Sequence, residues 1–318
     1  MALGTAHVTV TTANSGFGGG IFSPQLWSDE VIAAFKANLV VADLVTTMEH
    51  TGKKGDTIYI PKPTRGSPSQ KAAQTQVTLI AASESKNTYT INQHWEYSRL
   101  IEDIVSVQSL PSLRKFYTDD AGYALAKKID TYVQTFAGSL QSGTTYSAAV
   151  AGDGTTTWSA SANTNTGNGS ALTDDGIRRM IQKLDDADVP GRERALIIPP
   201  VEKRRLLGLA RFTEQAFTGE GASGNSPIRN GLIGDIYGIP VYVSSNVTQV
   251  AATNGTTMYY AGMLIHKDAL VFINQQSPRM QTQYKLEWLG DLMTCDTIFG
   301  GGLLRPEAGI AFMTPVVG

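Results

Sequence analysis

The histidines and the cysteine of this chain are the side chains best suited to bind metals, and they are few and scattered. The sequence has four histidines and one cysteine. No histidine has a second histidine or a cysteine at the short spacing that zinc sites use. A single cysteine excludes an internal disulfide and a cysteine-based metal site. We therefore expect no metal site and no cofactor; the residues concerned are His7, His50, His94, His266 and Cys295.

The clustered carboxylates do not form an acid–base pair. Residues 185–188 read Asp-Asp-Ala-Asp, but the glycine and the closing glutamate of a calcium loop are missing. A solvated helix C-terminus explains this run. The adjacent pairs at 119–120 and 174–175 point in different directions on a helix, so neither pair converges on a substrate.

Two glycine-rich runs, at residues 16–20 and 300–302, could suggest a phosphate-binding loop. Neither has the spacing of a nucleotide-binding motif, and neither lies between a strand and a helix. The second run precedes Leu-Leu-Arg-Pro, so we expect a turn there. Since the serine elbow motif is also missing, the sequence predicts no catalytic residue and no enzyme.

A basic strip on a helix expected over residues 201–212 is the remaining candidate for binding chemistry. Its cations are Lys203, Arg204, Arg205 and Arg211. They could contact phosphate, but no aromatic side chains are interleaved with them. A solvated helix face, or a strip of salt bridges between subunits, fits them better.

Composition limits the partners further. The chain has 318 residues, enough for about two or three compact units. Only 17% of them are charged, so we expect much of the surface to face protein. The net charge of -2 argues against tight nucleic-acid binding and permits weak contact only. Because no secretory signal and no run of about 18 apolar residues occurs, we expect a soluble protein made inside the cell, with no membrane partner.

A long helix predicted over residues 110–136 is the main element that positions the rest. Apolar side chains recur there every three or four residues and form one stripe, while Asp130 and other charged residues cover the opposite face. Such a helix is about 40 Å long, roughly twice the usual length. The stripe consists of Leu113, Phe116, Tyr117, Ala121, Ala124, Leu125, Ile129, Tyr132, Val133 and Phe136.

The segments before that helix are extended or poor in core-forming residues. Residues 1–24 are rich in Thr, Ser, Ala and Gly and should be disordered or lie as an arm over another subunit, and residues 24–45 show helical spacing. From residue 55 the period changes to two, which predicts a long hairpin with a polar tip at 63–76 and a return at 77–97. A two-stranded ribbon is marginal alone, so it should lie on something else.

The second half of the chain mixes helices and strands without a regular strand–helix–strand repeat, which predicts an α+β fold. Residues 142–170 should be an irregular loop or a short hairpin. Thr173 is placed to cap a helix that ends near a Val-Pro-Gly turn at 189–191. A flexible loop is expected over 213–230, and strands are expected at 195–198, 234–243, 258–274, 280–288 and 310–313.

This order of parts resembles a known family. Residues 172–178 read Leu-Thr-Asp-Asp-Gly-Ile-Arg, and residues 183–200 continue into a Val-Pro turn with arginine and a strand that ends in proline. Further matches lie at 234–244, 266–270 and 299–310. Together they resemble the major capsid protein of tailed bacteriophages, with the Hong Kong 97-like fold that encapsulins share.

The resemblance implies a division of the chain into an arm, a hairpin loop and two domains. Residues 1–48 would be the N-terminal arm with its short helix, 49–98 the extended β-hairpin loop, 99–170 the peripheral domain with the long helix, 171–272 the axial domain, 273–299 peripheral-domain strands, and 300–318 the return to the axial domain.

The function implied is a major capsid protein that self-assembles into the icosahedral shell around the double-stranded DNA of a tailed phage. It would belong to the virion and assemble in the host cytoplasm. Implied partners are further copies in hexamers and pentamers, a portal protein, separate scaffolding or decoration proteins, and packaged DNA in weak, non-specific contact. Contacts between subunits are expected at Arg65, Lys71, Tyr89, Ile91, Trp95, Arg204, Arg211, Glu214 and Arg229.

Three other functions remain open on the sequence alone. An encapsulin compartment would share the fold but carry an enzyme cargo and no genome. A hydrolase with a dispersed site is disfavoured because His, Cys and carboxylate groups do not converge. A phage tail or decoration protein is the third alternative, and the shape of the particle would distinguish it.

Overall fold

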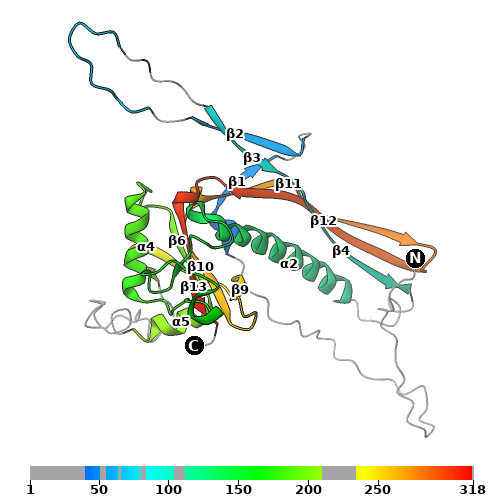
Figure 1. The fold of residues 1–318 in the computed structure, drawn as a ribbon. Helices are drawn as coiled ribbons and strands as arrows, with labels where there is room; N and C mark the ends of the chain where they lie inside the picture. The colour runs from blue at the N-terminus through cyan, green and yellow to red at the C-terminus, as the bar shows by residue number, and fades with distance from the viewer. Residues whose placement is uncertain are drawn as a thin grey trace, which may run out of the picture.

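The computed structural model describes residues 40–50, 55–63, 66–77, 79, 84–103, 112–209 and 234–316. The expected arm over 1–24, nearly all of the expected helix over 24–45 and the loop over 213–230 lie outside these residues. Figure 1 shows a domain built on the larger sheet, a long ribbon of strands with a helix along it, and a hairpin that projects away from both.

The larger sheet has seven strands in the order β5-β13-β10-β6-β8-β7, with β9 paired to β10 beside this path. Neighbouring strands are antiparallel except β5 with β13 and β6 with β8. The strands are β5 (Val150–Ala151), β6 (Arg194–Ile198), β7 (Asp235–Ile236), β8 (Ile239–Val243), β9 (Gln249–Ala251), β10 (Met258–His266) and β13 (Gly309–Pro315).

Helices α4 (Asp174–Asp186) and α5 (Pro200–Leu207) share a buried core with this sheet. The Thr173 hydroxyl accepts the Gly176 N–H at 3.0 Å, which confirms the predicted cap. Every residue of β6 is buried, as a continuous apolar run predicts for a central strand. The expected helix over 201–212 ends earlier than predicted, at Leu207, where Gly208 is the C-cap. Residues 210–212 lie outside the described residues.

A second sheet has four strands in the order β1-β11-β12-β4, and we call it the ribbon sheet. Helix α2 (Ser112–Thr135) lies along it, which confirms the predicted long helix (Figure 1). Ala121 and Leu125 of α2 pack on Cys295 and Tyr97 of the sheet. The strands are β1 (Thr46–Glu49), β4 (Gln93–Glu102), β11 (Leu270–Lys285) and β12 (Gly290–Leu303), and the short 3-10 segments are η1 (Val41–Leu44), η2 (Phe136–Ser142), η3 (Lys267–Ala269) and η4 (Pro306–Ala308).

Asp130 corrects the predicted polar face of the long helix, because its side chain is fully buried. One carboxylate oxygen accepts the Val41 N–H at 2.8 Å. The other accepts side-chain N–H groups of Gln134 at 2.9 Å and Asn246 at 2.8 Å. Asp130 therefore fastens η1 and the turn before β9 to α2, a role that needs partners from distant parts of the chain.

The two-stranded hairpin consists of β2 (Thr57–Pro63) and β3 (Glu84–Thr90), which pair antiparallel as predicted. The next strand differs from expectation. Residues 93–98, assigned above to the extended loop, begin β4, which pairs with β12 along its whole length in the ribbon sheet. The division of the chain into domains otherwise stays a prediction.

The glycine run at 300–302 is part of strand β12, so the expected turn at this place is wrong. The cause is the close crossing of the hairpin base. A Cβ atom at Gly300 would lie 2.7 Å from the Thr90 carbonyl oxygen, and one at Gly302 would lie 2.7 Å from the Tyr89 ring. Only glycine leaves room for this crossing.

The segment over 142–170 is largely irregular, as predicted, with strand β5 and the short helix α3 (Ala162–Asn165) inside it. Its aromatic residues nevertheless pack in the core. The Trp158 ring lies edge-on to Tyr146 and to Tyr259 of β10, with centroids 6.5 and 6.3 Å apart. A Ser/Thr/Gly-rich stretch is thus held by a few large rings.

Candidate assembly surfaces

The base of the hairpin is fastened to its own subunit. The Tyr89 hydroxyl donates a hydrogen bond to the Leu303 C=O at 2.8 Å, and the Asn87 side chain donates to the Leu304 C=O at 3.3 Å. Tyr89 and Ile91 pack with Val271 in one buried cluster. Burial raises the pKa of the Tyr89 hydroxyl, with the Asn87 hydrogen bond opposing this effect.

This arrangement corrects two of the expected intersubunit residues. Tyr89 is only 4% exposed and Ile91 only 6%, so both side chains are occupied inside the subunit. They position the hairpin and leave no apolar surface for a neighbour. The sequence showed their alternation along a strand but could not show which sheet they would cover.

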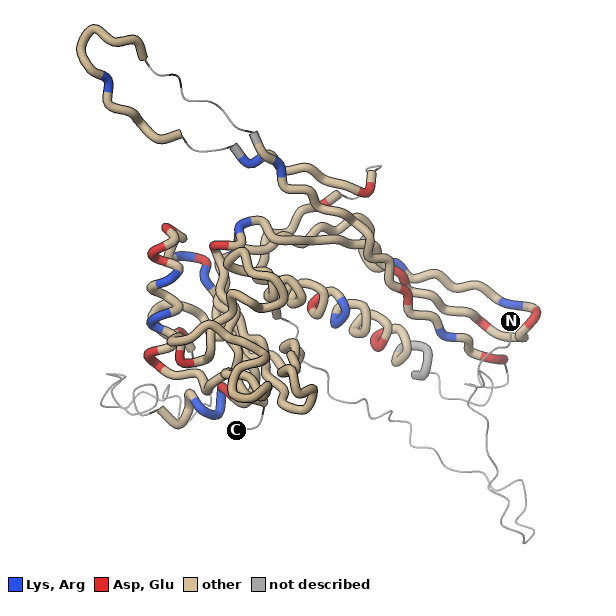
Figure 2. The backbone as a smooth tube through the Cα atoms, in the orientation of Figure 1, with Lys and Arg blue, Asp and Glu red and all other residues tan. Residues whose placement is uncertain are grey.

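The rest of the hairpin reaches outward, away from both sheets (Figure 1). Every described residue from 66 to 77 is exposed, and Lys71 is the one charged residue among them. Figure 2 shows that this tip carries little charge, whereas helix α4 carries charged residues of both signs. Leu79 is 90% exposed, and Tyr59 and Val77 are also exposed. Lys71 is exposed, and its contact with a neighbouring subunit stays a prediction, whereas Arg65 lies outside the described residues.

A second apolar surface, which we call the ribbon end, lies at the turn between β11 and β12. We did not expect this surface from the sequence. Leu286 is 79% exposed and Leu289 63%. The signal that could have shown it is the run Leu-Glu-Trp-Leu at 286–289, in a turn where polar residues are the rule. Its members are Leu100, Tyr284, Leu286, Trp288 and Leu289, all of them exposed.

The ribbon end is held by polar contacts that leave these side chains outside. The Asp103 N–H donates to the Leu289 C=O at 2.9 Å, and the Tyr284 hydroxyl donates to the Asp103 carboxylate at 2.7 Å. The pKa of the Tyr284 hydroxyl is raised, chiefly because of this hydrogen bond to a carboxylate. An ordered turn therefore presents leucine and tryptophan to solvent.

Trp95, another expected contact residue, lies on β4 and faces the long helix. The Lys128 ammonium sits 3.9 Å from the centroid of its ring, and its indole N–H donates to Gln93 at 3.1 Å. The ring is 37% exposed, so it is partly accessible from outside. A contact of Trp95 with a neighbouring subunit stays a prediction.

An ionic cluster around Asp296 stiffens the middle of the ribbon sheet. Arg279 donates to the two carboxylate oxygens at 2.8 and 3.1 Å, Gln276 donates at 2.9 Å, and the exposed His94 lies at 3.3 Å. The hydrogen bond from Arg279 is the main reason why the pKa of Asp296 is lowered to about 2, against the opposing effect of burial. The cluster bridges β4, β11 and β12 at the place where β11 is irregular.

The basic side chains of α5 differ in environment: one pairs with a buried carboxylate of its own subunit, and another is exposed to solvent. The buried Glu202 accepts the Leu172 N–H at 2.9 Å with one carboxylate oxygen and pairs with Arg205 through the other. Arg205 is therefore committed to its own subunit, whereas Arg204 is exposed. Arg211, Glu214 and Arg229 lie outside the described residues. Contacts of Arg204, Arg211, Glu214 and Arg229 with a neighbouring subunit stay predictions.

In the described part of the chain, no group of three or more His, Cys, Asp or Glu side chains could hold a metal ion. No helix within the same residues has the length and apolar character needed to cross a bilayer.

Comparisons with known proteins agree on one kind of protein. A family model described as phage capsid protein matches residues 102–311. The fold is similar to that of Mycobacterium phage Che8, with a TM-score of 0.71 and 22% identity over 93% of this chain and 98% of that one. The capsid of the cyanophage P-SCSP1u gives 0.69 and 21% over 94% and 95%, and that of Ralstonia phage GP4 gives 0.65 and 16% over 95% and 98%. None of the curated proteins matches the sequence.

Proposed function

This chain belongs to the phage capsid protein family, and we propose that many copies of it close into an icosahedral shell around the double-stranded DNA of a tailed phage. It is a major capsid protein, and its role in the virion is structural, not enzymatic. The proposal concerns how copies join and what they enclose.

One observation carries the proposal: the subunit has filled cores yet exposes large apolar side chains at two distant places. The projecting hairpin and the ribbon end hold most of the exposed large apolar residues of the described chain. Exposed apolar patches of this kind mark interaction surfaces. Because the two patches differ in sequence and shape, a contact between them would be heterologous, which produces rings when the rotation closes.

Assembly from several such contacts explains how a weakly charged subunit can form a strong shell. Each copy would be held by several neighbours at once, so modest single contacts add up through multivalency. We propose hexamers and pentamers of this chain as the units, with the larger sheet toward the centre of each unit and the ribbon sheet at its periphery. A portal, separate scaffolding or decoration proteins, assembly in the host cytoplasm and weak contact with packaged DNA complete the proposal.

The test is negative-stain electron microscopy of the purified full-length protein, with its phage scaffolding protein added in a parallel sample. Closed particles of uniform diameter are expected. The nucleic acid content of particles from infected cells separates a genome shell from an encapsulin compartment, because an encapsulin should hold an enzyme cargo and no genome. Only unassembled subunits in both samples at high concentration would count against the proposal.

A further inference from the structure

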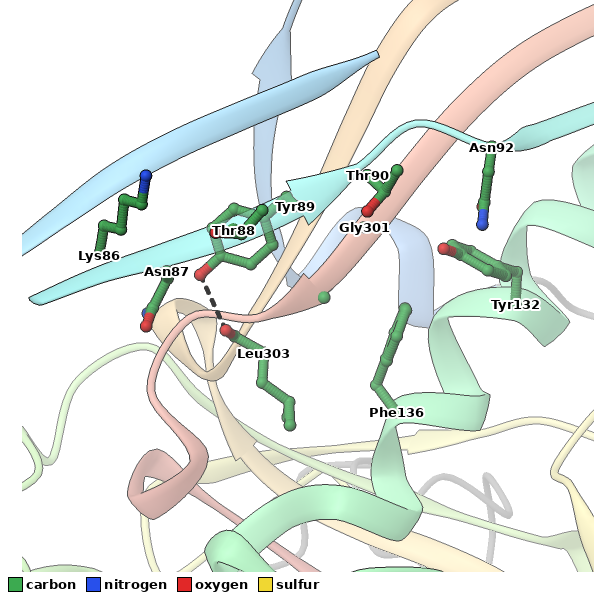
Figure 3. A pocket seen from close by; sticks show the side chains of 11 residues that line it. Lys86, Asn87, Thr88, Tyr89, Thr90, Asn92, Tyr132, Phe136, Gly301 and Leu303 are labelled. Carbon is green, nitrogen blue, oxygen red and sulfur yellow. Dashed lines mark hydrogen bonds between the residues drawn. The ribbon is translucent and has the colours of Figure 1, made fainter.

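The ribbon sheet is covered at one end by its own chain and has open edges along the rest of its length. At the covered end β1 pairs with residues 271–274 of β11. The hairpin base crosses β12 there, beside a cavity of about 460 Å³, and the Tyr89 hydroxyl bonds the Leu303 C=O (Figure 3). Farther along, β11 over residues 279–285 and β4 over residues 93–102 pair with β12 and with no other described strand. We call their outer sides the β11 edge and the β4 edge.

One hydrogen bond fixes which backbone groups lie on these edges. The Asp103 N–H donates to the Leu289 C=O at 2.9 Å, across β4 and β12. Bonded and non-bonded pairs alternate along antiparallel strands, so the even-numbered residues of β4 turn their N–H and C=O groups outward. Carried across β12, the same alternation places outward groups at Met280, Thr282 and Tyr284 of β11. Each edge therefore presents unpaired donors and acceptors to a partner strand.

The two edges carry opposite charges at the same levels of the sheet. Glu96 on β4 lies in one transverse row with Arg279 on β11, with Asp296 of β12 between them. Glu102 lies in one row with Lys285, six positions farther along each strand. Residues of one row share a face of the sheet, so the two carboxylates and the two cations lie on the same face.

We propose that the β4 edge of one copy adds in parallel to the β11 edge of a second copy. In this register Glu96 lies beside Arg279 of the second copy. Glu102 lies beside its Lys285. The strands are parallel because β4 and β11 both run antiparallel to β12, and a second ribbon sheet placed sideways keeps that direction. The inference rests on the proposed function, and it names two surfaces through which copies join.

The backbone groups of the two edges fit in this register. In a parallel pair, a residue whose groups point at the partner bonds the two residues that flank its opposite. Glu96 would donate to the Pro278 C=O and accept the Met280 N–H, and Ser98 would continue with the Met280 C=O. Pro278 has no N–H to offer, but only His94, beyond the first charged pair, would need it.

The face of the sheet that packs on α2 agrees with the same register. Tyr97 of β4 and Met280 of β11 lie in one row with Cys295, and this row faces α2. In the joined sheet Tyr97 would lie beside Met280 of the second copy, whose side chain is 40% exposed in the single subunit. A thioether against an aromatic ring is a favourable contact.

Charge also selects unlike edges over like edges. Two copies of the same edge would pair antiparallel, and the register that joins their whole length sets Glu96 opposite Glu102 on β4. On β11 it sets Arg279 opposite Lys285. Like charges directly opposite each other destabilise a strand pair. A contact between unlike edges is heterologous, and such contacts close when the copies surround a rotation axis.

Disulfide trapping between two preparations tests the register. Ser98 and Gln281 lie in one row, so they would be direct neighbours in the joined sheet. One preparation carries Ser98→Cys and the other carries Gln281→Cys, and the two are mixed before assembly and oxidised with glutathione disulfide. The native Cys295 stays in place because it is buried. Opposed residues of adjacent strands have the Cα separation that a disulfide needs.

We expect a covalent dimer that links positions 98 and 281 in the mixed particles, with at least a tenfold lower dimer yield when either variant is assembled alone. Equal yields from a single preparation would show that like edges pair and would overturn the inference. The absence of any dimer in intact particles would do the same. In both cases normal particles leave the proposed function standing, whereas failure of the original protein to form particles removes both.

A charge exchange gives an independent measurement. Glu102→Lys and Lys285→Glu each bring like charges together across the proposed contact, and the double variant restores opposite charges there. We expect the yield of closed particles to drop at least fivefold in each single variant and to recover at least half of the original yield in the double variant. Urea unfolding midpoints of the subunits serve as the control for folding. Single variants that assemble normally, or a double variant that assembles no better than they do, would contradict the inference.

Discussion

The hydroxyl of Tyr89 on the hairpin donates a hydrogen bond to the C=O of Leu303 at the end of β12, across 2.8 Å. This bond joins the projecting hairpin to the ribbon sheet at the point where the glycine run of β12 lets the hairpin cross. The base of the hairpin is therefore fixed in direction relative to the rest of the subunit. Its direction decides which part of a neighbour it can reach.

Gly302→Ala should loosen the hairpin base. The new Cβ atom would lie 2.7 Å from the Tyr89 ring, which has to move and lose its packing. Overpacking of this kind costs about 1–3 kcal/mol. Hydrogen exchange of the β2 and β3 amides should become faster by at least tenfold. Gly191→Ala is the control, because a Cβ there has no neighbour within 4 Å; similar exchange in both variants would contradict the prediction.

Asp130→Asn should destabilise the whole subunit. The buried carboxylate accepts hydrogen bonds from Val41, Gln134 and Asn246, and an amide would point an N–H group at one of these donors. A buried donor without an acceptor costs about 1–3 kcal/mol. The midpoint of urea unfolding should drop accordingly. Asp186→Asn, on the exposed end of α4, should change the free energy of unfolding by less than about 0.5 kcal/mol. Equal midpoints for the two variants would be the contrary result.

Asp296 should make the stability of the subunit depend on pH in the acid range. Its pKa is about 2 in the folded protein against an ordinary value of 3.8, so folding favours the ionised form. The stabilisation is complete above about pH 4 and is lost as the pH falls toward 2. Unfolding of the original protein and of Asp296→Asn, measured from pH 6 to 2, should differ above pH 4 and converge below it. A difference that stays constant down to pH 2 would show that this carboxylate is not the source.

Polar substitution of the ribbon end should block assembly and leave the subunit folded. Leu286 and Leu289 are exposed, so Leu286→Ser with Leu289→Ser removes little intramolecular packing and should change the free energy of unfolding by less than about 0.5 kcal/mol. Sedimentation and negative-stain images should show few closed particles. Glu287→Gln in the same turn is the control. Normal particle yields from the double variant would rule out a contact at this surface.

Deletion of the hairpin tip, residues 65–74, should give a folded subunit that closes poorly. The described residues of this tip are exposed and take no part in either core. Circular dichroism and thermal unfolding should match the full-length protein, whereas the yield of closed particles should drop by at least tenfold. Particles of normal size and number would show that the tip is not an assembly contact.

The sequence alone identified the elements whose side chains repeat regularly. The cap at Thr173, the buried strand at 195–198 and the long helix all follow from local periodicity and capping chemistry, and the structure has them within a few residues of the expected places. The order of these elements also indicated the fold class and the family. Local patterns suffice here because each residue's preference depends on neighbours close in the chain.

Tertiary structure decided what each surface is used for. Periodicity placed Asp130 among the solvent-facing charges, but partners more than eighty residues away bury it. The glycines at 300–302 looked like a turn until the crossing of Tyr89 required a strand without side chains. A sequence pattern shows which face of an element is apolar, but not which distant element covers that face or leaves it open. For this protein that difference separates the residues that fasten the hairpin from those left exposed.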